Sequence, residues 1–191
     1  MKLRKRFGTF TEMLLLAATG LASGDGCLGA DLRVGIIGTD TSHATAFTEV
    51  LNNPQAKGHV PGGKVVAAFK GGSRDIESSW SRVEQYANTL QEKYGVTIYN
   101  SIEELCRNVD CVLIESVDGR PHLEQVKPVL AAKKPMYIDK PMAGSLREVL
   151  EIFELAKKDN VPVFSASSLR FAQDKQAARR GQVGTVTSAE T

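Results

Sequence analysis

The stretch LRVGIIG, residues 32–38, decides the fold of this 191-residue chain. It is a nearly continuous apolar run that ends in glycine, which is typical of a parallel strand buried on both faces. The residues TDTSH, 39–43, follow directly, and either Thr41 or Ser42 can cap a helix that stops at residues 53–54. The stretch therefore predicts a strand, a tight turn and a helix, the opening unit of a parallel α/β sheet.

Short apolar strands and amphipathic helices alternate about six times along the rest of the chain. Further strands are expected at residues 64–69, 96–99, 110–115, 135–139 and 162–166. Helices are expected at residues 79–94 and 121–132, and after the capping boxes that start at Ser101 and Ser145. The last of these helices is expected to bury Leu146, Val149, Leu150 and Phe153. This order predicts an α/β fold with a doubly wound parallel sheet and helices on both faces.

Composition and charge place the chain among ordinary globular proteins. It is 42% hydrophobic and 24% charged, which is far from the composition of disordered chains. The net charge of +2 comes from residues 1–30, which hold four basic and two acidic side chains, because residues 31–191 hold 20 of each. A neutral body lacks the electrostatic footprint of a nucleic-acid-binding protein. Cys106 and Cys111 form no CxxC motif, and we expect both to be buried as small apolar residues.

Residues 1–30 are predicted to be an export signal. A basic start is followed by an apolar run at residues 13–22 and then by small residues, the layout of a secretory signal. The apolar run is about half of the ~20 residues that a stable membrane span requires. We therefore expect a periplasmic or extracellular protein without a stable membrane span. The alternative is a disordered N-terminus.

The loop after the first strand is a candidate site for a diphosphate. A strand, a turn with glycine and a helix start direct backbone N–H groups towards such an anion. Read as G-x-G-x-x-G, however, the loop has Gly38 followed by Asp40 and His43 at the positions of the other two glycines. A carboxylate at residue 40 would repel a diphosphate unless it points away or is neutralised.

The loop after the second strand carries Ser73 and Arg74, which could accept a ribose 2′-phosphate. This pair favours NADP over NAD, and the alternative is a solvated basic turn. The loop after the strand at 110–115 contains Ser116, and it leads to His122 in the first turn of the next helix. That histidine would face the same crevice, although a lone histidine is often only a hydrogen-bonded structural residue.

The loop DKP, residues 139–141, ends the strand at 135–139 with an acid and a lysine. A lysine held beside an acid in a crevice can position a hydroxyl substrate or help its proton to leave. The alternative for Lys140 is an exposed surface side chain.

Taken together, these segments resemble the N-terminal domain of the Gfo/Idh/MocA oxidoreductases, the family of glucose-fructose oxidoreductase and inositol dehydrogenase. The resemblance rests on VGIIG at 34–38, SVDGRPH at 116–122, DKP at 139–141 and GQVG at 181–184, and it spans about residues 32–188. Its most specific element is DKP, which is similar to the Glu-Lys-Pro motif of the family with Asp in place of Glu.

The resemblance implies a Rossmann-like dinucleotide-binding domain, with NAD or NADP as cofactor and a sugar, inositol or similar polyol as substrate. By the same resemblance, Lys140 would contact the reacting hydroxyl and His122 would line the nicotinamide pocket, so these two are the catalytic candidates. Pro141 would follow a cis peptide bond. The cofactor-binding candidates are Gly38, Thr39, Asp40, Thr41, Ser42, Ser73, Arg74, Ser116, Asp139 and Pro141.

The resemblance also implies a second domain that supplies most of the substrate pocket and of the oligomer contacts. We expect residues 31–170 to form the cofactor domain and residues 171–191 to begin a truncated second domain, with a strand at 185–188. The chain is therefore expected to be a fragment through whose missing domain oligomers could form.

Two other functions stay open. The first is a non-catalytic Rossmann-fold binding module that has lost the cofactor, with Asp40, Ser42 and His43 binding a sugar or a metal instead. No metal site is predicted, because a third ligand is not visible in the sequence. The second is a truncated product that performs nothing alone.

Overall fold

The structure is a computed structural model that describes residues 30–167, 172–182 and 185. The chain divides into two units, residues 1–30 and residues 31–191. The predicted export signal, except for Ala30, and most of the strand predicted at 185–188 lie outside the described residues. Among the described helices, none is both long and apolar enough to cross a bilayer.

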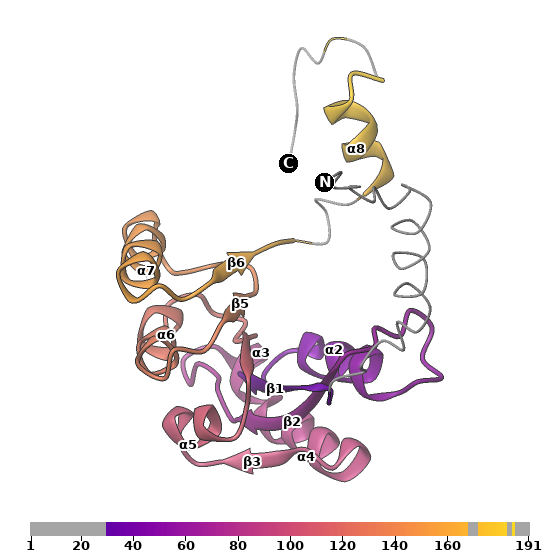
Figure 1. Cartoon of the computed structure of the whole chain (residues 1–191), viewed down its shortest axis with the longest axis vertical. Coiled ribbons are helices and arrows are strands. Elements are labelled where there is room, and N and C mark those ends of the chain that lie inside the picture. Colours follow the sequence, from indigo (N-terminus) through magenta and orange to yellow (C-terminus); the bar gives the residue numbers. More distant parts are fainter. Residues whose placement is uncertain (1–29, 168–171, 183–184, 186–191) are drawn as a thin grey trace, which may run out of the picture. The chain divides into compact units, whose positions relative to one another are not determined.

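Six parallel strands form one sheet in the order β3-β2-β1-β4-β5-β6 (Figure 1). This order confirms the predicted doubly wound sheet, because the chain starts at the centre and moves first to one edge and then to the other. The strands are β1 (Leu32–Ile37), β2 (Gly63–Phe69), β3 (Thr97–Tyr99), β4 (Cys111–Ile114), β5 (Met136–Ile138) and β6 (Val163–Ser165).

Helices cover the sheet on two sides. The helices α5, α6 and α7 lie along one side, whereas α2 and α4 pack on each other on the opposite side (Figure 1). The helices are α2 (Ser42–Asn52), α3 (Glu77–Trp80), α4 (Val83–Tyr94), α5 (Ile102–Arg107), α6 (His122–Ala131), α7 (Leu146–Asp159) and α8 (Gln173–Arg179).

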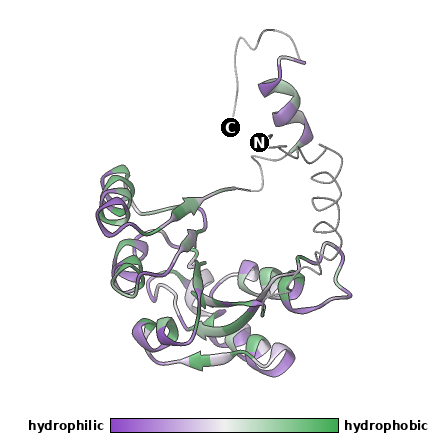
Figure 2. Ribbon diagram, in the orientation of Figure 1, coloured by the Kyte–Doolittle hydropathy of each residue, from purple (hydrophilic) through white to green (hydrophobic). Residues whose placement is uncertain are grey.

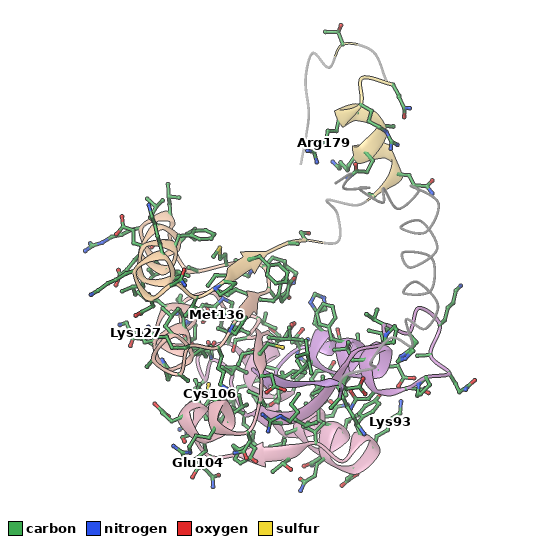
Figure 3. The ribbon with its side chains drawn as sticks, in the orientation of Figure 1. Lys93, Glu104, Cys106, Lys127, Met136 and Arg179 are labelled. Carbon is green, nitrogen blue, oxygen red and sulfur yellow. The ribbon has the colours of Figure 1, made fainter. Side chains whose placement is uncertain are left out.

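Alternate strand residues enter two separate cores, one on each face of the sheet. Val34 and Ile36 of β1 belong to the core under α2 and α4, whereas Ile37 belongs to the larger core under α5 to α7. The larger core contains Cys106 and Met136 (Figure 3). Burial raises the pKa of the Cys106 thiol to about 11, so this cysteine is the buried apolar residue that the sequence predicts. Apolar strands lie between helices that carry both hydrophilic and hydrophobic residues (Figure 2).

Helix ends follow the predicted capping residues. The hydroxyls of Thr41, Ser101 and Ser145 each accept a hydrogen bond from a backbone N–H in the first turn of the following helix. Gly95 ends α4 in the left-handed conformation, with φ of 69°. These local signals depend on only a few neighbouring residues, which explains why the sequence predicts them.

The helix predicted at 79–94 is wrong in one respect, because the structure has two helices there, α3 and α4. Ser79 is buried in α3, where its hydroxyl accepts from the Ser73 N–H at 2.8 Å and donates to Asp40 at 2.6 Å. These tertiary bonds hold the short helix against the first loop, and the chain turns at residues 81–82 before α4 begins.

The predicted buried face of α7 is also corrected. Leu146, Leu150 and Phe153 are 73%, 56% and 45% exposed, whereas Ile152 and Ala156 are the buried residues. The helix packs on its neighbour α6, so only a narrow stripe of its apolar surface is covered.

One face of β4 to β6 carries a further apolar feature. A groove of about 430 Å³ is lined by side chains that include Phe47 of α2, Leu113, Tyr137 and Phe164. The aromatic rings of Tyr137 and Phe164 lie 5.2 Å apart, and Phe164 is 62% exposed.

Candidate functional site

The loops that follow β1, β2, β4 and β5 converge at one edge of the sheet, as predicted. Backbone hydrogen bonds join them in sequence: the Gly38 N–H donates to Phe69 O, the Glu115 N–H to Ile37 O, and the Asp139 N–H to Ile114 O. This is the edge at which parallel sheets of this topology bind ligands.

Gly38 is required at the first turn by its surroundings. Its φ is +102°, and a Cβ atom there would lie 2.4 Å from the Ser116 backbone nitrogen. The loop after β2 is equally close, because a Cβ on Gly71 would lie 3.0 Å from the Gly38 Cα. The backbones of three loops therefore touch at this point, and a side chain would separate them.

The residues at the start of α2 differ in whether their side chains are accessible to a ligand. Thr39 is buried and its hydroxyl donates to Val83 O at 3.0 Å, while Thr41 is used as the helix cap. Ser42 is exposed at the helix start. A diphosphate at this helix N-terminus would therefore meet Ser42 and backbone N–H groups rather than the Thr39 hydroxyl.

Asp40 is fully buried and its carboxylate has partners. It accepts a hydrogen bond from the Ser79 hydroxyl at 2.6 Å and from the Val117 backbone N–H at 3.3 Å. The carboxylate is thus held inside the protein between the loops after β2 and β4. These bonds direct it towards Ser79 and Val117 and away from solvent, from which a diphosphate would approach.

The loops after β2 and β4 are also linked at the outer end of the crevice. Ser73 is nearly buried and donates to Asp118 at 2.5 Å, and Arg120 bonds both Asp118 and Asp75. The Arg120 guanidinium, helped by Ser73, lowers the pKa of Asp118 to about 2. The Arg74 guanidinium lies 4.7 Å from the centre of the Trp80 ring. The adenosine contacts of Ser73 and Arg74 stay a prediction.

Lys140 and Asp139 follow β5 and face a small cavity. Asp139 is 4% exposed, and the Lys140 ammonium nitrogen lies 3.8 Å from its Oδ2 atom. The peptide bond between Lys140 and Pro141 is cis, as the family resemblance implies. The cavity, of about 250 Å³, is lined by His43, Ala46, Phe47, Tyr137, Asp139, Lys140 and Ala166.

His122 lies in the protein interior rather than at the wall of that cavity. Its ring is fully buried, with Nε2 2.9 Å from Ser116 O and Nδ1 3.2 Å from Met142 O. Ser116 is buried beside it, and its hydroxyl bonds the Gln125 amide. The imidazole thus ties the loops after β4 and β5 together. The catalytic role of His122 stays a prediction, and its contacts favour a positioning role.

Two further side chains lie at this edge: Glu115, to which the sequence analysis gives no role, and His43, which appears there only in the alternative of a sugar or metal site. Glu115, directly after β4, is fully buried. The Nδ1 atom of His43 lies 2.7 Å from Asp139 Oδ2. In the sequence, Glu115 could have been identified as a site residue because it is an acid at the end of a buried apolar strand. His43 could have been identified by its position in the first turn of α2.

Residues 32–167 match a family model described as an oxidoreductase family with an NAD-binding Rossmann fold. The chain belongs to this family, the Gfo/Idh/MocA oxidoreductases. The match covers all six strands and the four loops at the crevice. The recognition from DKP and its companion motifs is therefore confirmed, and the family supports a nicotinamide cofactor without choosing between NAD and NADP.

Several relatives have known activities or structures. Myo-inositol 2-dehydrogenase of Thermotoga maritima is 32% identical over 108 residues, which are 53% of this chain and 32% of that protein. The structure of scyllo-inositol dehydrogenase from Lactobacillus casei with NAD(H) and scyllo-inositol has a TM-score of 0.59 at 20% identity, covering 82% of this chain and 43% of that chain. Biliverdin reductase from Synechocystis, with biliverdin and NADP+, has a TM-score of 0.61 at 20% identity, covering 80% and 43%. This chain spans about a third of the curated relatives that it matches.

The first loop fits a nicotinamide dinucleotide. Gly38 lets the backbone of the first turn approach its neighbours, the exposed start of α2 offers N–H groups, and Asp40 is turned inwards. The helix dipole attracts an anion to the exposed start of α2, and the Asp40 carboxylate is hydrogen-bonded by the Ser79 hydroxyl and the Val117 N–H instead.

Proposed function

We propose that this chain is the cofactor-binding part of an NAD(P)-dependent oxidoreductase that acts on a hydroxyl of a polyol or sugar. The observation that carries the proposal is the convergence at one crevice of the Gly38 turn, the start of α2 and the Lys140–Asp139 pair. The named activity of the inositol dehydrogenase relatives supports the substrate class.

The start of α2 and Gly38 would hold the diphosphate of the cofactor, and Arg74 would lie at the adenosine end. The exposed guanidinium of Arg74 favours NADP, because it could pair with a 2′-phosphate. A bound nicotinamide supplies a hydride acceptor or donor.

Lys140 would orient the reacting hydroxyl of the substrate. Its ammonium group is about half exposed and borders the 250 Å³ cavity, so a small polar molecule can reach it. The carboxylate of Asp139 lies beside it, with Oδ2 3.8 Å from the ammonium nitrogen. Lys140 can then donate a hydrogen bond to the hydroxyl oxygen and stabilise negative charge there as the hydroxyl proton leaves.

The remaining parts of the proposal concern the whole protein. We propose that residues 1–30 direct export, that residues 31–170 are the cofactor domain, and that a second domain starting near residue 171 completes the substrate pocket. Oligomers would form through that second domain. The residues matched are about a third of each of the two curated relatives.

Titration with NADP and NAD tests the cofactor proposal. The chain has one tryptophan, Trp80, which stacks with Arg74, so cofactor binding at the adenosine end should change its fluorescence. We expect saturable quenching, with tighter binding of NADP. The Arg74→Ala variant should lose the preference for NADP by about tenfold, the loss of one charge-assisted contact of about 1.4 kcal/mol. The Arg107→Ala variant, at the end of α5, is the matched control.

The observations also favour one second candidate, a binding module without a cofactor. The bonds of Asp40 to Ser79 and Val117, together with the Ser73–Asp118 bond, close the loops after β2 and β4 onto each other. If neither dinucleotide binds below about 1 mM, the oxidoreductase proposal fails and this candidate replaces it. If the Asp40→Gly variant then binds a dinucleotide, the residue at position 40 is the cause of the lost cofactor binding.

A further inference from the structure

Three potential metal ligands from three separate elements meet at the floor of the crevice. His43 lies in the first turn of α2, Glu115 directly follows β4, and Asp139 directly follows β5. Their donor atoms all lie within 4.8 Å of one another. Because the parallel sheet brings these strand ends together, the cluster is held by the core of the fold rather than by a surface loop.

Within this cluster, the carboxyl group of Glu115 has no hydrogen-bond partner among the described residues. The residue has no exposed surface. A buried carboxyl that cannot hydrogen-bond destabilises a protein whether it is charged or neutral. A cation between Glu115 and Asp139 would remove both the unsatisfied oxygens and the repulsion between the two acids.

The donor set favours a transition-metal ion. One imidazole nitrogen and two carboxylate oxygens suit zinc, manganese, iron or cobalt, whereas calcium and magnesium prefer oxygen ligands alone. The Tyr137 hydroxyl lies 3.2 Å from the other oxygen of Asp139 and 2.9 Å from Ala166 O, so the two acceptors share its single proton.

To hold an ion, the three donor atoms have to shift from their present spacing, in which all lie within 4.8 Å of one another. Metal–donor bonds of about 2.0–2.2 Å place neighbouring donor atoms roughly 3.3 Å apart. His43 Nδ1 and Asp139 Oδ2 are 2.7 Å apart, so the imidazole has to move outwards slightly. The His43 side chain is 39% exposed and can do so. Lys140, at 3.8 Å from Asp139, is the competing cation, and its exposed ammonium group can turn towards solvent.

We propose that His43, Glu115 and Asp139 bind one divalent transition-metal ion. His43 and Asp139 also line the 250 Å³ cavity, so the coordination positions that the protein leaves open face that cavity. A water or a substrate oxygen beside Lys140 would occupy them. The site does not depend on the dinucleotide, and its test is separate from that of the proposed function.

Cobalt and zinc titrations of the chelator-treated full chain test the site. We expect Co²⁺ to bind with one ion per chain and to give visible absorption bands of an ion with nitrogen and oxygen ligands. Calorimetry with Zn²⁺ should give the same stoichiometry, and saturating Zn²⁺ should raise the melting temperature, because the ion binds only the folded chain.

Two variants assign the ligands, and one serves as the control. Glu115→Gln and His43→Ala should each lower the Zn²⁺ affinity at least tenfold. His43 is half-exposed, so its variant keeps the test decisive if Glu115→Gln fails to fold. His59→Ala should leave the affinity unchanged, since His59 bonds Val50 O away from the cluster. The proposal is overturned if no stoichiometric binding occurs, or if His43→Ala binds zinc as well as the unaltered chain.

Discussion

Asp40 replaces a glycine of the phosphate-binding motif and has a structural role in its place. At the second position of a glycine-rich phosphate loop, its carboxylate would be expected to oppose an anion. In the structure it lies inside the protein, where the Ser79 hydroxyl and the Val117 N–H satisfy it. The same residue that departs from the fingerprint therefore ties the first loop to two others and leaves the exposed start of α2 free for a ligand.

Replacement of Gly38 tests the close approach of the three loops. Gly38→Ala places a Cβ 2.4 Å from a backbone nitrogen and forces alanine into a positive φ, so we expect a loss of about 3 kcal/mol in the free energy of unfolding. Gly58→Ala is the control, because its φ is +86° but nothing lies within 4 Å of the added atom. The Gly58→Ala variant should lose about 1 kcal/mol of unfolding free energy. Equal losses in urea denaturation would show that Gly38 is not confined by its neighbours.

At the scale of elements, α7 shows that amphipathic periodicity identifies a helix better than it identifies the buried face. The helix and its cap at Ser145 are where the sequence predicts them. The apolar surface is wider than the contact with α6, however, so several of its apolar residues remain in solvent. Which stripe is buried depends on the neighbouring helix rather than on α7 itself.

A pair of alanine variants on α7 tests this assignment. Ile152→Ala removes a fully buried side chain and should cost about 2–5 kcal/mol of unfolding free energy. Leu150→Ala removes a side chain that is 56% exposed and should cost less than about 1 kcal/mol. Chemical denaturation of both variants measures the difference. A larger effect at Leu150 would mean that another part of the protein covers this face.

At the scale of the whole molecule, side-chain bonds join the loop after β2 to the loop after β4. These strands lie on opposite sides of β1, and their loops are joined by Ser73, Asp118, Arg120 and Asp75. The links span residues about 45 positions apart in sequence. They close the two halves of the sheet over the end of β1, where the proposed cofactor would bind.

Low pH should weaken the bonds of Asp118 to Arg120 and Ser73, because the carboxylate becomes protonated. The pKa of Asp118 is about 2 in the folded protein, below the value of about 3.9 for an unfolded chain. The stabilising effect is therefore complete above pH ~5 and is lost as the pH falls towards 2. Asp118→Asn should lose about 1–2 kcal/mol of stability at pH 7 and progressively less at lower pH. A constant difference between pH 7 and pH 3 would contradict the assignment; Asp110→Asn, which removes an exposed pair with Arg33, is the comparison variant.

Much of the fold and part of the site are determined by the sequence alone. The strand order follows from the alternation of apolar runs and helices, and the helix caps follow from residues such as Thr41 and Ser145. These features depend on neighbours within one turn and on the handedness of crossover connections, so a linear pattern contains them.

Only the tertiary structure decided what the side chains at the crevice do. Asp40 is turned inwards by Ser79, His122 is enclosed by two carbonyl groups, and Glu115 is buried beside Asp139 without a hydrogen bond. The partners of Asp40 and Glu115 come from other strands and loops, and His122 joins Ser116 to Met142, 20 positions further along the chain than the histidine. Burial and pairing set the charge and chemistry of a side chain, and neither is fixed until the chain has folded.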